Sequence, residues 1–403
     1  MVWGIFALSN QYKSMIGHLS KKGKYSTMFT PPQTTAQSLR ISRKLSVLFC
    51  TAILIALSLS LSRSGSAAAQ ASTAPKVYAG IFKDNVVAVI DTSTNQVIKT
   101  IPVPVGPDGM AMAKDGKTVY VSSAGDTKVN VIDTATDAIV GTIEVGKAPN
   151  GLALTPDGKQ LLVAVFGASQ IAIVDTSTLK VTAQIAVPSP HNIAISSDDK
   201  TAYVSANYAA DNATPITMTV LNLTTQTVSA NIPLKATART LNFSPDGKSL
   251  YFTQDGVDSV QVLDVATNTI TTQIAVGAAP HHVLFTPSGE FGLVVSQKTN
   301  ELSLIDPKTN TIAAKIAVGK KPHWIAVTAA NIAYITNENE NTISVVDLKT
   351  QKVTATIPVG NAPHKIVVQP SAVSASNTES ATAAATMSAP MAATMAATNN
   401  SGY

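Results

Sequence analysis

The chain has 403 residues, of which 45% are hydrophobic, and its mean hydropathy is +0.19, so it can bury a large core and is not disordered throughout. The net charge of +5 originates in residues 1–71, which hold eight basic and no acidic side chains, whereas the remainder holds 21 basic and 24 acidic ones. The remainder is therefore weakly acidic, and this balance disfavours nucleic acid as a partner.

Residues 1–71 have the three-part layout of an export signal. A basic cluster at 40–44 precedes an apolar run of 18 residues at 45–62, and small residues at 67–71 offer A-x-A cleavage sites. Positive charge before an apolar run places the following chain on the far side of the membrane. We therefore expect a periplasmic, secreted or cell-surface protein.

Two alternatives concern this segment. Met28 is a more plausible start than Met1, because it shortens the region before the apolar run. The run is also near the lower length limit for a membrane span, so an uncleaved anchor would be the protein's only membrane attachment. Cys50, the single cysteine, lies in this run, which excludes disulfides, thiolate metal sites and covalently attached haem from the exported part.

A tandem repeat occupies the chain from residue 76 to 370. Each unit carries a Tyr or Leu followed by an Asp or Asn, and the first positions are spaced by 42, 42, 41, 48, 42 and 41 residues. The first positions are Tyr78, Tyr120, Leu162, Tyr203, Tyr251, Leu293 and Tyr334, and their partners are Asp91, Asp133, Asp175, Asn222, Asp264, Asp306 and Asp347.

Each unit contains four short apolar runs separated by turn residues, which predicts four strands. Asp-Gly pairs such as Asp157-Gly158 join the first run to the second, and Asp-x-x-Thr segments join the third to the fourth. Four antiparallel strands in about 42 residues, repeated seven times, predict an all-β, seven-bladed β-propeller. The first unit lacks its inner strand and 365–368 is a spare one, so we expect the carboxyl-terminal strand to close the ring.

The repeats resemble those of the YVTN-type β-propeller family. The resemblance rests on Tyr120-Val-Ser-Ser, Tyr334-Ile-Thr-Asn and recurring Val-Gly-x-x-Pro-His and Pro-Asp-Gly-Lys segments, and it covers about residues 76–370. It implies an exported or surface-layer-associated protein that is usually a non-catalytic binding protein. Similar propeller units also occur beside copper and haem sites in redox enzymes.

Residues 371–403 have a different composition, dominated by Ala, Thr, Ser and Asn with few charges. Such a segment cannot bury enough apolar surface to order itself, so we expect a disordered tail.

Polar residues recur where each predicted inner strand begins, and parallel blades would gather them at one mouth of the central channel. The aligned positions are Asp108, Asn150, His191, Arg239, His281, His323 and His364, with Trp324 beside them. Arg239 could hold an anionic ligand. His281, His323 and His364 come from three consecutive units, so they form a candidate Zn²⁺ or Cu²⁺ site; the alternative is that they only cap the strand connections.

The loops between the second and third strands of each unit emerge on the same predicted face and differ in sequence. The widest, Asn207–Pro215, belongs to a unit with six extra residues. Variable loops on a rigid scaffold are typical of recognition surfaces. We therefore expect a monomeric, non-catalytic binding or scaffold protein for a protein, glycan or small-molecule ligand. A metal-binding or redox-accessory propeller and a lactonase-like hydrolase are the alternatives.

Overall fold

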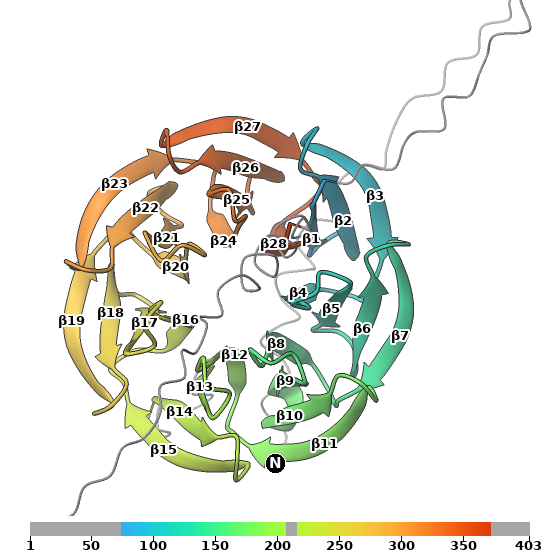
Figure 1. Cartoon of the computed structure of the whole chain (residues 1–403), viewed down its shortest axis with the longest axis vertical. Coiled ribbons are helices and arrows are strands. Elements are labelled where there is room, and N and C mark those ends of the chain that lie inside the picture. Colours follow the sequence, from blue (N-terminus) through green and yellow to red (C-terminus); the bar gives the residue numbers. More distant parts are fainter. Residues whose placement is uncertain (1–73, 207–215, 372–403) are drawn as a thin grey trace, which may run out of the picture. The chain divides into compact units, whose positions relative to one another are not determined.

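The computed structural model describes residues 74–206 and 216–371. These residues form seven four-stranded antiparallel sheets, arranged as blades around a central axis (Figure 1). The prediction of an all-β, seven-bladed propeller is confirmed. The predicted export signal at 1–71, the Asn207–Pro215 loop and the predicted tail beyond Ser371 lie outside the described residues.

The blades are numbered here in chain order, and their strands are given from the innermost outward. Blade 1 contains β28 (Pro363–Val368), β1 (Lys76–Ile81), β2 (Val86–Asp91) and β3 (Gln96–Pro102). Blade 2 contains β4 (Pro107–Met112), β5 (Thr118–Ser123), β6 (Lys128–Asp133) and β7 (Ala138–Glu144). Blade 3 contains β8 (Pro149–Leu154), β9 (Gln160–Val165), β10 (Gln170–Asp175) and β11 (Lys180–Ala186), with the 3-10 turn η1 (Phe166–Ala168) after β9.

Blade 4 contains β12 (Pro190–Ile195), β13 (Thr201–Ala206), β14 (Thr217–Asn222) and β15 (Thr227–Pro233). Blade 5 contains β16 (Ala238–Phe243), β17 (Ser249–Gln254), β18 (Ser259–Asp264) and β19 (Thr269–Ala275). Blade 6 contains β20 (Pro280–Phe285), β21 (Gly292–Ser296), β22 (Glu301–Asp306) and β23 (Thr311–Ala317). Blade 7 contains β24 (Pro322–Val327), β25 (Ile332–Asn337), β26 (Thr342–Asp347) and β27 (Lys352–Pro358).

The repeated turns form as their residues predict. Gly116, Gly158 and Gly247 follow an aspartate between the two inner strands and have φ values of 71°, 74° and 69°, a region that glycine enters without steric cost. Between the two outer strands of blade 2, the Asp133 carboxylate accepts hydrogen bonds from the N–H and the hydroxyl of Thr136, both at 2.8 Å. Equivalent turns between the outer strands form at Asp175 and Asp264, whose carboxylates accept hydrogen bonds from the N–H groups of Thr178 and Thr267.

Tyrosines at the first repeated position connect neighbouring blades. The buried Tyr78 hydroxyl donates to Asp137 at 2.5 Å, and the Tyr203 hydroxyl donates to Asn268 at 2.6 Å. Both acceptors lie in a turn of the next blade and have positive φ values of 50° and 55°. Asp and Asn adopt that conformation more readily than most residues, which accounts for their place in the turn.

The hydrophobic core is divided among the blade interfaces. In the described chain, seven clusters of buried apolar residues each join two neighbouring blades. The cluster between blades 7 and 1 packs Ile343 and Ile357 against Val77 and Ile366. Each blade therefore depends on both of its neighbours for burial.

The carboxyl-terminal strand closes the ring, as predicted. β28 pairs antiparallel with β1, placing Val368 opposite Val77 and Ile366 opposite Ala79 (Figure 1). The strand begins at Pro363, two residues before the predicted 365–368 segment. Blade 1 is thus built from both ends of the repeat region.

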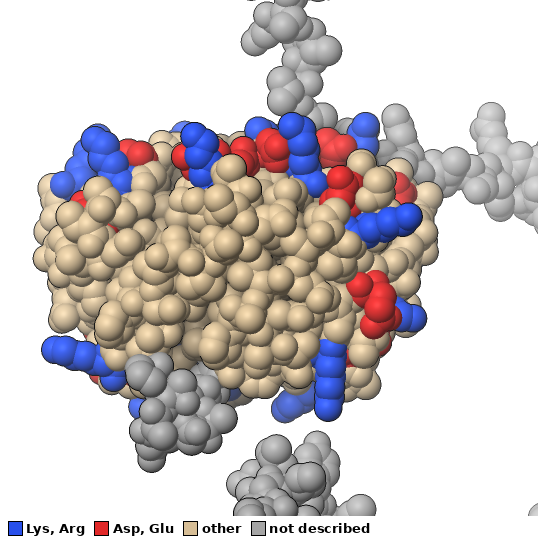
Figure 2. Space-filling model, turned by 90° about the horizontal axis from the view of Figure 1, so that it is seen from below, with Lys and Arg blue, Asp and Glu red and all other residues tan. Residues whose placement is uncertain are grey.

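Charged side chains gather on the two faces of the propeller, as its side view shows (Figure 2). The flank in that view is mostly uncharged, and the outermost strands expose residues such as Ile98 and Val140. No helix within the described residues is long and apolar enough to cross a membrane.

Candidate functional site

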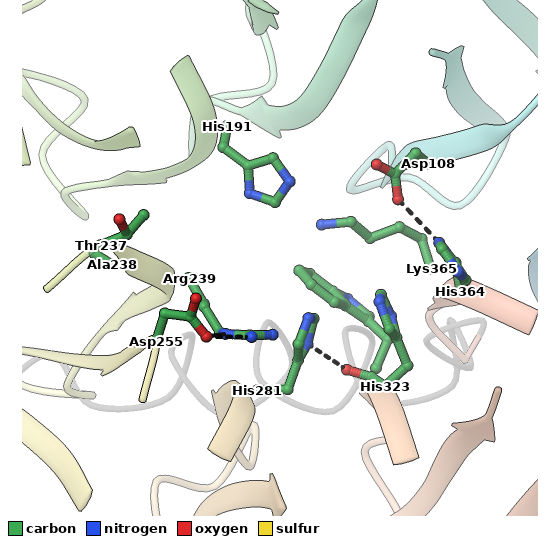
Figure 3. A pocket seen from close by; sticks show the side chains of 11 residues that line it. Asp108, His191, Thr237, Ala238, Arg239, Asp255, His281, His323, His364 and Lys365 are labelled. Carbon is green, nitrogen blue, oxygen red and sulfur yellow. Dashed lines mark hydrogen bonds and ion pairs between the residues drawn. The ribbon is translucent and has the colours of Figure 1, made fainter. Parts of the chain in front are cut away.

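The aligned polar positions form one pocket at the end of the channel where the innermost strands begin. Each is the second residue of its strand, and all except Asn150 line a cavity of about 170 Å³, which Trp324 also lines (Figure 3). The structure therefore brings together the seven predicted residues Asp108, His191, Arg239, His281, His323, Trp324 and His364. Four lining residues were not predicted as site residues: Thr237, Ala238, Asp255 and Lys365. We call this cavity the mouth pocket.

An ion pair and a histidine–carboxylate hydrogen bond lie in its wall. The Arg239 guanidinium contacts the Asp255 carboxylate, which comes from the loop after β17. The His364 ring places Nδ1 3.2 Å from Asp108 Oδ1. Burial alone would raise the pKa of Asp108, but the hydrogen bond from His364 and the charge of Lys365 outweigh it and lower this pKa to about 2. Asp108 is therefore a carboxylate throughout the physiological range.

Burial keeps most of the histidines neutral. It lowers the pKa of His191 to about 4, and it holds the pKa values of His281, His282 and His323 well below 6.5. His281 Nδ1 lies 3.0 Å from the His323 carbonyl, which only accepts, so Nδ1 carries the proton and Nε2 has a free lone pair. Neutral imidazoles are the form that binds metal ions.

Three of the imidazole rings form a stack along one side of the pocket. The His281 and His323 ring centroids are 4.1 Å apart, those of His323 and His364 are 4.3 Å apart, and Phe82 lies 4.3 Å beyond His364. His323 is 8% exposed, and its Nδ1 has no hydrogen-bond partner. This nitrogen is a buried polar atom that a ligand could satisfy.

Lys365 extends from the closing strand across the channel. Its Nζ donates to Asn192 Oδ1 on blade 4 at 2.7 Å and lies 3.1 Å from the centre of the Trp324 ring. Figure 3 shows the side chain reaching into the pocket toward His191. Burial lowers the pKa of Lys365 to about 7, although the charge of Asp108 opposes this shift. Its Nζ forms no direct ion pair with any described carboxylate.

The described loops that follow β1, β17 and β25 lie at the same end of the channel as the mouth pocket, as predicted. Asp255 reaches Arg239 from one of these loops, and Asp84 in another accepts hydrogen bonds from Asn361, which precedes β28. A third loop, after β25, carries Glu338. One ligating atom each of Glu338, His323 and His364 lies within 4.8 Å of the other two, a convergence found among the described residues. This group shares two histidines with the predicted metal set, and His281 is not part of it.

Comparisons with known proteins support the propeller fold. A family model described as a YNCE-like β-propeller matches residues 65–156, and one described as a lactonase with a seven-bladed β-propeller matches residues 215–316. No match was found among curated proteins.

Solved structures with similar folds are distant in sequence. Hydrazine synthase from Kuenenia stuttgartiensis aligns with a TM-score of 0.60 and 19% identity over 65% of this chain and 89% of that one. Dihydro-heme d1 dehydrogenase NirN in complex with DHE gives 0.57 and 16% identity, covering 74% and 76%. Apo AztD from Citrobacter koseri gives 0.56 and 19% identity, covering 73% and 97%. At these identities the likeness concerns the fold alone, and the function has to be argued from the pocket.

Proposed function

We propose that this protein is an exported, non-catalytic propeller of the YVTN type that binds a small polar ligand in the mouth pocket. The observation that carries the proposal is the convergence of six second-position residues from separate blades on one cavity. Polar side chains from separate blades that meet only in the folded ring are typical of a binding site. The export signal predicted at 1–71 supports a role outside the cytoplasm.

The size of the pocket limits its ligand. A volume of about 170 Å³ is enough for several water molecules. An ion, a small organic molecule or one side chain fits such a space. The surrounding loops would then control access to the pocket.

The lining offers complementary contacts to a small polar molecule. Arg239 presents a planar set of N–H donors, Lys365 adds an amine, and the neutral imidazoles can donate or accept. The Trp324 ring supplies an apolar face beside them. Hydrogen bonds made in this largely buried setting are stronger than those on the open surface.

Ligand-observed NMR with a panel of small carboxylates and amino acids tests the proposal. Replacing Arg239 with Gln should weaken binding about 10- to 100-fold, the effect of losing a hydrogen bond to a charged group. Lys298→Gln is the matched control, because Lys298 lies on the same face outside the mouth pocket. Binding that Arg239→Gln leaves unchanged would place the ligand elsewhere, and a panel without any binder would count against the proposal.

A lactonase-like hydrolase is the second candidate. The lactonase family match spans residues 215–316, which include Arg239, Asp255 and His281 of the mouth pocket. Small lactones added to the same NMR panel separate the two functions. Binding without ring opening supports a binding protein, whereas ring opening that is lost in His281→Ala identifies a hydrolase.

A further inference from the structure

Two histidines that line the mouth pocket bring metal-ligating atoms close to Glu338, which is not itself a lining residue. One atom from each of His323, His364 and Glu338 lies within 4.8 Å of the others. Ligands that surround a tetrahedral Zn²⁺ ion at about 2.1 Å are about 3.4 Å from one another. Side-chain shifts of about an ångström would therefore close this group around an ion.

Asp108 fixes the orientation of His364. The His364 ring directs Nδ1 to the Asp108 carboxylate at 3.2 Å and is stacked between Phe82 and His323. Because a carboxylate accepts, Nδ1 carries the proton and the lone pair is on Nε2. A carboxylate bonded to the far nitrogen of a metal-binding histidine is the usual arrangement around such ligands, where it sets the tautomer and the ring direction.

His323 differs from His364, because its buried Nδ1 has no hydrogen-bond partner. The residue is only 8% exposed and packs between two other imidazoles, so water has little access to it. Buried nitrogens are rarely left unpaired, and each such atom asks for an explanation such as an ion. A metal ion bound by His323 together with His364 and Glu338 would provide such an explanation.

Glu338 completes the group from the loop after β25. Its Oε1 accepts a hydrogen bond from Lys321 Nζ at 2.7 Å, and its side chain is only 16% exposed. The pairing holds the carboxylate near the histidines and leaves Oε2 for another contact. A carboxylate would also offset part of the charge of a bound cation.

We propose that one Zn²⁺ or Cu²⁺ ion binds at the edge of the mouth pocket through His323, His364 and Glu338, with Asp108 as a positioning residue. The inference rests on the proposed function, because two of the three ligands line the same pocket. Imidazole suits both metals, and three protein ligands leave a fourth position open for water or a second small ligand. His281 is not a ligand in this proposal, since it lies outside the converging group.

The test is a titration of the full chain with Zn²⁺ against a chromophoric chelator, together with Cu²⁺ EPR spectra. We expect one equivalent of tightly bound metal and nitrogen hyperfine coupling in the Cu²⁺ spectrum. His323→Ala should abolish binding, and Glu338→Gln should weaken it by more than about 100-fold, beyond the 10- to 100-fold loss typical of outer-shell changes. Glu340→Gln is the matched control, because Glu340 is an exposed carboxylate of the same loop and lies outside the group.

Asp108→Asn tests the positioning role. This variant keeps an acceptor but loses the charge, so Zn²⁺ affinity should fall at least about 10-fold and the Cu²⁺ EPR parameters should shift. Circular dichroism and melting of each metal-free variant check that the fold is retained. An affinity and spectrum identical to the wild type would remove Asp108 from the proposal.

Other results would overturn the site itself. A wild-type protein that binds no metal, or binding that survives both His323→Ala and Glu338→Gln, contradicts it. If His281→Ala abolishes binding while Glu338→Gln does not, the three-histidine set is correct and this ligand set is wrong. If metal does not bind but a small carboxylate does so through Arg239, the inference fails while the proposed function stands.

Discussion

Ending the chain at Asn361 removes the closing strand β28 and should destabilise the whole propeller. Ile366 is 1% exposed, so its loss costs about 2–3 kcal/mol, and the half-buried Val367 and Val368 add about 1 kcal/mol each. The four paired positions between β28 and β1 contribute about 1 kcal/mol each. The total of about 8 kcal/mol is comparable to the entire stability of a typical domain, which is about 5–15 kcal/mol.

Thermal unfolding by circular dichroism, with size-exclusion chromatography to detect aggregation, measures this loss. The shortened chain should be insoluble or should melt at least about 15 °C lower, because about 1 kcal/mol shifts the Tm of a large domain by about 2–4 °C. A peptide of residues 361–371 added in trans should restore part of the loss. A chain ending at Ser371 is the control and should melt like the full protein. Cooperative melting of the Asn361 truncation within about 2 °C of the full chain would refute the reasoning.

Three further predictions follow from buried polar groups. Burial lowers the pKa of the partly exposed His191 to about 4, so below about pH 6.5 its folded form binds fewer protons than its unfolded form. His191 should therefore contribute about 1–2 kcal/mol to the fall in stability between pH 7.5 and 5, in addition to the contributions of His281, His282 and His323, and His191→Gln should reduce the fall measured in urea titrations by that amount. Tyr78→Phe leaves the Asp137 carboxylate without its 2.5 Å hydrogen bond and should cost about 1–3 kcal/mol, whereas an unchanged Tm would contradict the blade connection. Lys365→Met removes a buried amine. Because burial lowers the pKa of this amine from 10.5 to about 7, keeping it in the folded state costs up to about 4 kcal/mol at pH 7.5, partly offset by its contact with Trp324 and its hydrogen bond to Asn192. The variant should therefore be at least about 1 kcal/mol more stable in urea at pH 7.5, and this gain should vanish as the pH rises to 10.5.

The architecture was predictable because the propeller repeats its local chemistry. A spacing near 42 residues, Asp-Gly turns and a tyrosine at a fixed position recur along the chain, so each unit reports independently on the same fold. The count of strands also showed that the first repeat lacked an inner strand and that the carboxyl-terminal end of the repeat region had one strand to spare. The repeat also predicts which residues meet at the mouth pocket from the innermost strands, because equivalent residues of successive blades lie at the same end of the channel.

The rest of the site was not predictable because it departs from that register. Asp255 and Glu338 lie on loops whose sequences differ between blades, and no repeat fixes their direction. Lys365 is the third residue of β28, and a lysine beginning a strand is normally solvated. The equivalent third positions of β20 and β24 hold His282 and Trp324. An imidazole and a large aromatic ring at these positions indicate that this position faces other side chains, which is the sequence signal that could have identified Lys365.

The closing strand joins stability to binding. β28 buries Ile366 at the interface of blades 7 and 1, and the same six residues supply His364 and Lys365 to the mouth pocket. The pocket is therefore complete only when the ring is closed, so a ligand of the pocket binds the closed state preferentially. At 100 times its Kd such a ligand adds about 2.7 kcal/mol to the stability of the closed ring. Ile366→Ala separates the two roles: it should cost about 2–4 kcal/mol in the free protein, and a ligand should restore most of that loss, because the variant leaves the lining of the pocket intact.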